Sequence, residues 1–79
     1  MCASTWGMSI ETFQKKLGKQ IAGIRKKAGL SQTELALRLD KDRQWMNYLE
    51  KGHGNPTSKT LYEIANELKV PVKDLLDFD

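Results

Sequence analysis

Apolar positions recur every three or four residues along most of the chain, which is the spacing of an amphipathic helix. The first stripe consists of Phe13, Leu17, Ile21 and Ile24, while lysines occupy the other faces. Ser9 can cap the start of this segment, and Gly29 supplies the left-handed residue that commonly follows a helix. The pattern therefore predicts a first helix over residues 9–28.

Residues 31–52 contain two shorter periodic segments with a break between them. Ser31 and Glu34 have the spacing of a capping box at the start of the first segment. Asp42 can cap the second segment, and Gly52 can end it. The apolar positions are Leu35, Ala36 and Leu39 in the first segment, and Trp45, Met46 and Leu49 in the second. This pattern predicts two short helices joined by a tight turn, which is a helix-turn-helix whose second helix can enter a DNA major groove.

The remaining chain predicts two more helices. HGNPT has the composition of a turn. Thr57 or Ser58 can cap a fourth helix that runs to about Leu68, and Pro71 can open a short fifth helix that runs through Leu76. No segment shows the alternation of a strand. The expected fold class is therefore all-α, with five short helices around one core and a helix-turn-helix at its centre.

With 79 residues the chain is long enough for one domain. We expect a flexible leader or tag remnant at residues 1–8 and the helix-turn-helix domain at residues 9–79. No apolar run approaches the roughly 18 residues of a membrane span, and the start lacks the features of a secretory signal. Cys2 has no second cysteine to pair with, which favours a reducing compartment and a cytoplasmic location.

The net charge of +3 is unevenly distributed along the chain. Residues 1–30 carry six Lys and Arg and one acid, residues 31–55 carry equal numbers of each sign, and residues 56–79 carry three bases and five acids. A basic front and an acidic tail suit a protein that approaches a polyanion in one orientation. Solvated helix faces explain the same distribution equally well.

Several segments carry a family likeness: GKQIAGIRKKAGLSQTELA, LEKG, NPT, TLYEIANEL and VPVKDLL. In this order, over about residues 17–76, they make the chain resemble the lambda-repressor-like, or XRE-type, helix-turn-helix domain of bacterial and phage regulators. The resemblance implies a sequence-specific transcriptional regulator that binds a (pseudo)palindromic operator in double-stranded DNA as a homodimer, with residues 42–51 as the recognition helix. Asp40 departs from the glycine common in this turn, and Trp45 is much bulkier than the small residue usual at its position.

The outward face of the predicted recognition helix offers polar side chains for reading bases. Arginine can bond bidentately to guanine, and glutamine or asparagine to adenine. The expected base contacts are Arg43, Gln44, Asn47 and Tyr48. The family places its readers at the start of this helix, which implicates Arg43 and Gln44 first. The alternative is that all four are ordinary surface residues.

Contacts to the DNA backbone are expected on both sides of these readers. The family uses a glutamine at the start of the first motif helix for this purpose, where free backbone N–H groups also attract anions. The predicted phosphate contacts are Gln32, Lys51, His53, Asn55, Ser58 and Lys59. His53 has no Cys or His partner at ligand spacing, so no metal site is predicted.

Two further predictions concern the assembly of the domain. The resemblance implies a structural ion pair between Arg25 and Glu50. The apolar end of the chain exceeds what a monomer needs, so Leu76 and Phe78 are predicted at a dimer interface, although the same residues could simply close the core.

Two other function classes are weighed. A protein-interaction module, such as the antitoxin of a toxin–antitoxin pair, would also have a protein partner. An enzyme is not expected, because the sequence shows no paired nucleophile and base, no metal cluster and no phosphate-binding loop, and the core should have no room for a cleft of about 300 Å³. The sequence does not determine which operator sequence is bound or whether binding represses or activates transcription. It also does not distinguish among a phage repressor, a restriction–modification controller and an antitoxin.

Overall fold

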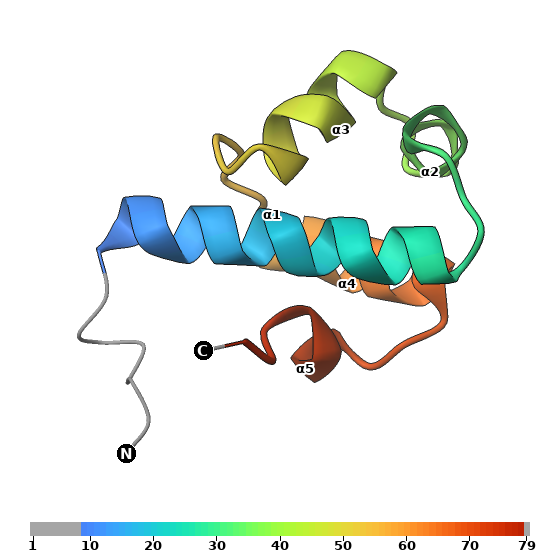
Figure 1. Cartoon of the computed structure of the whole chain (residues 1–79). Helices are drawn as coiled ribbons and strands as arrows, with labels where there is room; N and C mark the ends of the chain where they lie inside the picture. Colours follow the sequence, from blue (N-terminus) through green and yellow to red (C-terminus); the bar gives the residue numbers. More distant parts are fainter. Residues whose placement is uncertain (1–8, 79) are drawn as a thin grey trace.

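A computed structural model of the chain describes residues 9–78, and this part folds into five α-helices without a strand (Figure 1). The helices are α1 (Ile10–Lys27), α2 (Gln32–Arg38), α3 (Arg43–Glu50), α4 (Ser58–Leu68) and α5 (Val72–Leu75). The all-α prediction with five helices is confirmed. The predicted leader, residues 1–8, lies outside the described residues. None of the five helices is long and apolar enough to cross a membrane.

The long helix α1 is the centre of the arrangement. Helices α2 and α3 lie on one side of it and α5 on the other (Figure 1), and α4 packs against α5. The core is formed by side chains from all five helices: Leu17, Ile21, Leu35, Ala36, Leu39, Met46, Leu49, Ile64, Ala65, Leu68 and Leu75. Most of these positions are ones that the helical spacing assigns to an inner face, while three others that it assigns there, Phe13, Ile24 and Trp45, are only partly buried against the core.

The starts of α1 to α4 are each capped by a side chain that the sequence places there, whereas α5 begins after Pro71 without a side-chain cap. Ser31 and Glu34 form both halves of a capping box, with Ser31 N–H donating to Glu34 Oε1 at 2.8 Å and Glu34 N–H to Ser31 Oγ at 3.0 Å. Asp42 Oδ1 accepts from the backbone N–H of Trp45 at 2.7 Å, and Thr57 caps α4. Helix α5 ends at Leu75, one residue earlier than predicted.

Left-handed backbone angles occur where the predicted turns need them. Gly29 and Gly52, predicted to end α1 and α3, have φ values of 77° and 91°. Asp40 adopts φ 60° in the turn between α2 and α3, which Asp tolerates better than most residues. Lys69 also has φ 60°, at the end of α4. A lysine gives no sequence signal for this conformation, so this left-handed cap was not predicted.

A close approach of backbones fixes how α1 crosses α3. A Cβ atom at Gly18 would lie 2.6 Å from the carbonyl oxygen of Leu49 and 2.7 Å from that of Glu50. Any side chain at this position would therefore push α1 away from the last turn of α3. The sequence alone shows Gly18 only as a residue that weakens α1, and the contact supplies the reason for its presence.

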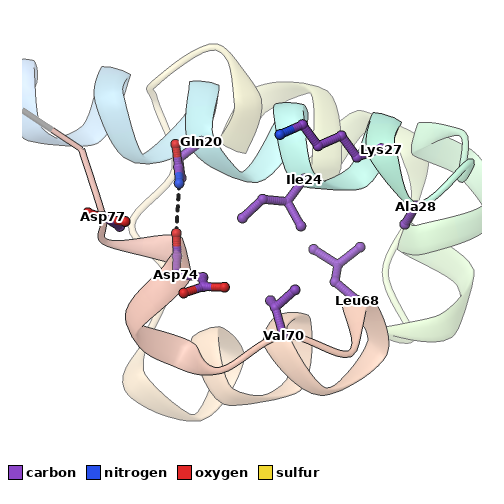
Figure 2. Close-up of a pocket in the computed structure, with 8 residues that line it drawn as sticks. All are labelled: Gln20, Ile24, Lys27, Ala28, Leu68, Val70, Asp74 and Asp77. Atoms are coloured by element: carbon purple, nitrogen blue, oxygen red, sulfur yellow. Dashed lines mark hydrogen bonds between the residues drawn. The ribbon is translucent and has the colours of Figure 1, made fainter.

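A hollow of about 450 Å³ separates α1 from the connection between α4 and α5 (Figure 2). Ile24, Leu68 and Val70 point into it, and Gln20 Nε2 closes one end by donating to the carbonyl oxygen of Asp74 at 2.8 Å. The expectation that no cleft of about 300 Å³ would exist is therefore wrong. The space lies beside the connection between α4 and α5, while α5 itself contacts α1 through the bond between Gln20 and Asp74.

Candidate nucleic-acid interface

The outer face of α3 presents polar side chains at the start of the helix. Arg43 and Gln44 are exposed, and Tyr48, one turn further on, is 59% exposed. The opposite face of α3 is held in the core by Met46 and Leu49. Three of the four predicted base-reading residues therefore project into solvent from a helix whose other side is fixed.

Asn47 differs from the other predicted readers because it is half-buried and faces α2. Gln32, at the start of α2, donates from Nε2 to Glu50 Oε1 at 2.9 Å and to Asn47 Oδ1 at 3.5 Å. Gln32 was predicted to contact a DNA phosphate, yet its carboxamide nitrogen is engaged with α3. A phosphate contact through this nitrogen would have to replace these bonds. The backbone N–H groups at the start of α2 need no such exchange.

Arg25 and Glu50 form the ion pair that the resemblance implies. Arg25 Nε donates to Glu50 Oε2 at 2.6 Å and Nη2 donates to Oε1 at 3.1 Å, and the two side chains are 8% and 7% exposed. The third nitrogen, Nη1, donates to the carbonyl oxygen of Leu30 at 2.8 Å. This bidentate pair joins α1, the loop before α2 and the last turn of α3. Helix α3 is therefore fixed to α1 at its C-terminal end.

The loop after α3 lies against α3 itself. A Cβ at Gly54 would lie 2.6 Å from Leu49 Cδ1 and 2.8 Å from Leu49 Cα, so the loop passes very close to α3. The ring of His53 lies 5.1 Å from that of Tyr48, centroid to centroid. The predicted phosphate contacts in and around this loop are all exposed: Lys51, His53, Asn55, Ser58 and Lys59. Among residues 9–78, no group of three or more His, Cys, Asp or Glu is placed to hold a metal ion.

Trp45 is partly buried against the core rather than projecting fully toward solvent. Lys41 Nζ lies 5.5 Å from the centroid of its ring, within the range of a cation–π contact. The core therefore accommodates the bulky side chain at the margin of α3, and the turn lysine covers it.

The two residues predicted at a dimer interface have different surroundings. Leu76 is 42% exposed. Phe78 packs against the core of its own chain, where its ring lies 5.5 Å from that of Phe13. This contact favours the alternative for Phe78, closing the core, and leaves Leu76 as the exposed apolar side chain at the end of α5.

Comparison with known proteins gives consistent matches over the same region. The family described as Helix-turn-helix matches residues 21–75. The chain is 38% identical over 64 residues to the uncharacterized HTH-type transcriptional regulator y4dJ of Sinorhizobium fredii, an alignment that covers 81% of this chain and 83% of the relative. It is 36% identical over 62 residues to the control protein C.BamHI of Bacillus amyloliquefaciens, covering 77% of this chain and 76% of that protein.

A solved structure with the same arrangement is that of the restriction-modification controller protein C.AhdI from Aeromonas hydrophila. It superposes with a TM-score of 0.74 at 27% identity, over 78% of this chain and 94% of that one. The similarity extends to both sides of the helix-turn-helix.

Proposed function

The chain belongs to the lambda-repressor-like helix-turn-helix family, and we propose that it is a sequence-specific transcriptional regulator that binds a (pseudo)palindromic operator as a homodimer. The observation that supports this most directly is the outer face of α3. Its exposed polar side chains begin at the N-terminal end of α3, the end whose residues would contact bases in the major groove. The similarity to transcriptional regulators and control proteins supports the same reading.

In this proposal Arg43 reads guanine through O6 and N7, and Gln44 reads adenine through N6 and N7. Tyr48 and, after release from Gln32, Asn47 contact bases further along the groove. The backbone N–H groups of α2 and the exposed residues of the loop after α3 hold the flanking phosphates. Such contacts set the register of the protein on DNA, while the base contacts set its sequence preference.

The two-fold assembly is proposed to form around Leu76 at the end of α5. A dimer of this family would place its two recognition helices one helical turn of DNA apart, roughly 34–36 Å. The operator should then contain two half-sites related by two-fold symmetry.

The experiment that tests this function is selection of binding duplexes from a random pool at low and moderate salt. Enrichment of a palindrome with half-sites about one helical turn apart is expected. Salt-sensitive binding without a preferred sequence would contradict operator reading. Failure to bind any duplex at either salt would instead favour the protein-partner alternative, such as an antitoxin.

A substitution at Arg43 tests the reading face directly. Arg43→Ala should weaken binding to the selected operator by roughly 5- to 150-fold, since a bidentate arginine contact contributes about 1–3 kcal/mol of discrimination. It should also relax the preference at one base position in each half-site. Arg38→Ala, at an exposed position near the end of α2, is the matched control and should change neither property. An equal loss of affinity for all DNA sequences would mean that Arg43 contacts a phosphate and not a base.

A further inference from the structure

A second basic surface lies beside the recognition helix, between the first half of α1 and the end of α3. It surrounds a hollow of about 420 Å³ lined by Thr12, Lys15, Lys16, Lys19, Glu50 and Lys51. Three of these lysines come from α1 and the fourth is the residue that caps α3. We call these four lysines the α1 lysine cluster.

No lysine of the α1 lysine cluster forms an ion pair among residues 9–78, not even Lys15 with Glu11, four residues before it on α1. Glu50 is the acidic residue that lines the hollow, and its oxygens are occupied by Arg25 and Gln32 while its side chain is 7% exposed. The two ion pairs found among residues 9–78 are Arg25–Glu50 and Arg38–Glu67, and neither includes a lysine of the cluster. Lys15 and Lys19 are four residues apart on one helix, where like charges repel. An anion in the hollow would relieve this repulsion.

The cluster is continuous with the proposed DNA-binding face. A Cβ at Gly52 would lie 2.6 Å from Lys15 Cγ and 2.8 Å from Lys15 Cα, so α1 at Lys15 is pressed against the turn that ends α3. Lys51 belongs both to this cluster and to the predicted phosphate contacts. An eight-residue helix is about 12 Å long, similar to the width of the major groove. Phosphates bordering the groove therefore come within reach of side chains at both ends of α3.

We propose that the α1 lysine cluster binds phosphates of the DNA backbone that flank each half-site. The contact extends the protected DNA beyond the base pairs read by α3. It adds affinity and salt dependence and leaves the base preference unchanged, because phosphates carry no direct sequence information. This inference rests on the proposed function, since it assumes a duplex seated on α3.

The test compares a triple variant, Lys15→Gln, Lys16→Gln and Lys19→Gln, with a control of equal charge change, Lys27→Gln, Lys69→Gln and Lys73→Gln. The control residues lie at the end of α1, after α4 and in α5, away from the cluster. Lys51 is left unchanged because it is already assigned to the loop contacts. Affinity is measured against salt on two duplexes that contain the selected operator, one ending close to the half-sites and one extended on both sides.

On the extended duplex the triple variant should reduce the slope of log K against log salt by about 2–3, since each phosphate contact contributes about 0.9. On the short duplex the wild type and the triple variant should have similar slopes of log K against log salt. The base preference should be unchanged on both. The control variant should retain the wild-type slope to within about 1 on the extended duplex.

Three results would overturn the inference. Equal slopes for wild type and triple variant on the extended duplex would exclude the flanking contact, while specific binding by the wild type would leave the proposed function standing. A base preference of the triple variant that differs from that of the wild type would mean that the lysines contact bases and not phosphates. Loss of binding to phosphatidylserine vesicles in the triple variant, with an unchanged DNA slope, would assign the cluster to anionic lipid. If the wild type selects no DNA sequence, the proposed function is contradicted, and this inference, which depends on it, is contradicted as well.

Discussion

Arg25 connects more parts of the domain than any other polar side chain discussed above. Its three guanidinium nitrogens bond the carboxylate of Glu50 and the carbonyl oxygen of Leu30, and it is 7% exposed. Among residues 9–78, no buried side-chain nitrogen or oxygen lacks a hydrogen-bond partner. Removing the arginine would leave a buried carboxylate with only Gln32 as donor.

We therefore predict that Arg25→Met lowers the free energy of unfolding by about 3–5 kcal/mol, the usual cost of breaking a buried ion pair from one side. Urea denaturation measures the loss. Arg38→Met is the matched control, because Arg38 Nη1 lies 4.0 Å from Glu67 Oε1 and the side chains are 49% and 34% exposed. That change should cost less than about 1 kcal/mol. Similar losses in the two variants would contradict the structural role of Arg25.

The two glycines inside α1 provide a second test at the scale of single residues. Gly23→Ala should stabilise the protein by about 0.5–1 kcal/mol, because nothing lies within 4 Å of the added Cβ and alanine favours the helix. Gly18→Ala should destabilise it by about 1–3 kcal/mol despite the same gain in helix propensity, since the new Cβ would meet the carbonyl oxygen of Leu49 at 2.6 Å. Thermal unfolding of both variants separates these effects. Stabilisation by both would show that α1 and α3 are not in close contact.

At the scale of the helices, the capping box of α2 makes stability depend on pH. The pKa of Glu34 lies below its ordinary value of 4.5, because its carboxylate accepts a hydrogen bond from the backbone N–H of Ser31 and then from the Ser31 hydroxyl. A carboxyl with a lowered pKa stabilises the fold above its ordinary pKa, and this contribution is lost as the pH falls through the lowered value.

Glu34→Gln should accordingly be less stable than wild type at neutral pH, and the difference should disappear as the pH falls below 4.5. The free energy of unfolding, measured in urea from pH 7 down to about pH 3, provides the comparison. A difference that stays constant over this range would mean that the carboxylate charge contributes nothing to the cap.

The helix boundaries could be predicted because their signals are local. Ser31 with Glu34, Asp42, and the glycines after α1 and α3 each act within a few residues of their position. The outward position of Arg43 likewise follows from helical periodicity once α3 is placed. Local signals were therefore sufficient to predict the helices and most of the exposed polar face of α3.

Contacts between distant segments could not be predicted from such signals. The approach of Gly18 to α3 depends on the crossing of two helices, and the packing of Phe78 on Phe13 joins the two ends of the domain. The contact of Gln32 with a DNA phosphate stays a prediction, but the hydrogen bond from its Nε2 to Glu50 Oε1 on the next helix could not be predicted. Each of these features needs the tertiary arrangement, which no short motif encodes.

For the whole molecule, the exposed end of α5 yields a prediction about assembly. Leu76→Lys should weaken self-association at least about tenfold, because a charge would replace an apolar side chain at the proposed interface. Sedimentation velocity over a range of concentrations, with and without operator, measures the change. Leu37→Lys, at a 70% exposed position on α2, is the control and should leave association unchanged. A wild-type protein that stays monomeric at high concentration, even with operator, would contradict the dimer.

The separation of the two faces of α3 has a consequence for how such regulators diverge. Arg43, Gln44 and Tyr48 are exposed, so if they read bases as proposed, mutations at these positions should redirect the protein to a new operator while the buried core stays unchanged. Position 47 is different, because its side chain is bonded to Gln32 on the neighbouring helix. Lineages that change Asn47 should therefore change Gln32 as well, and those two sites should be inherited as a pair.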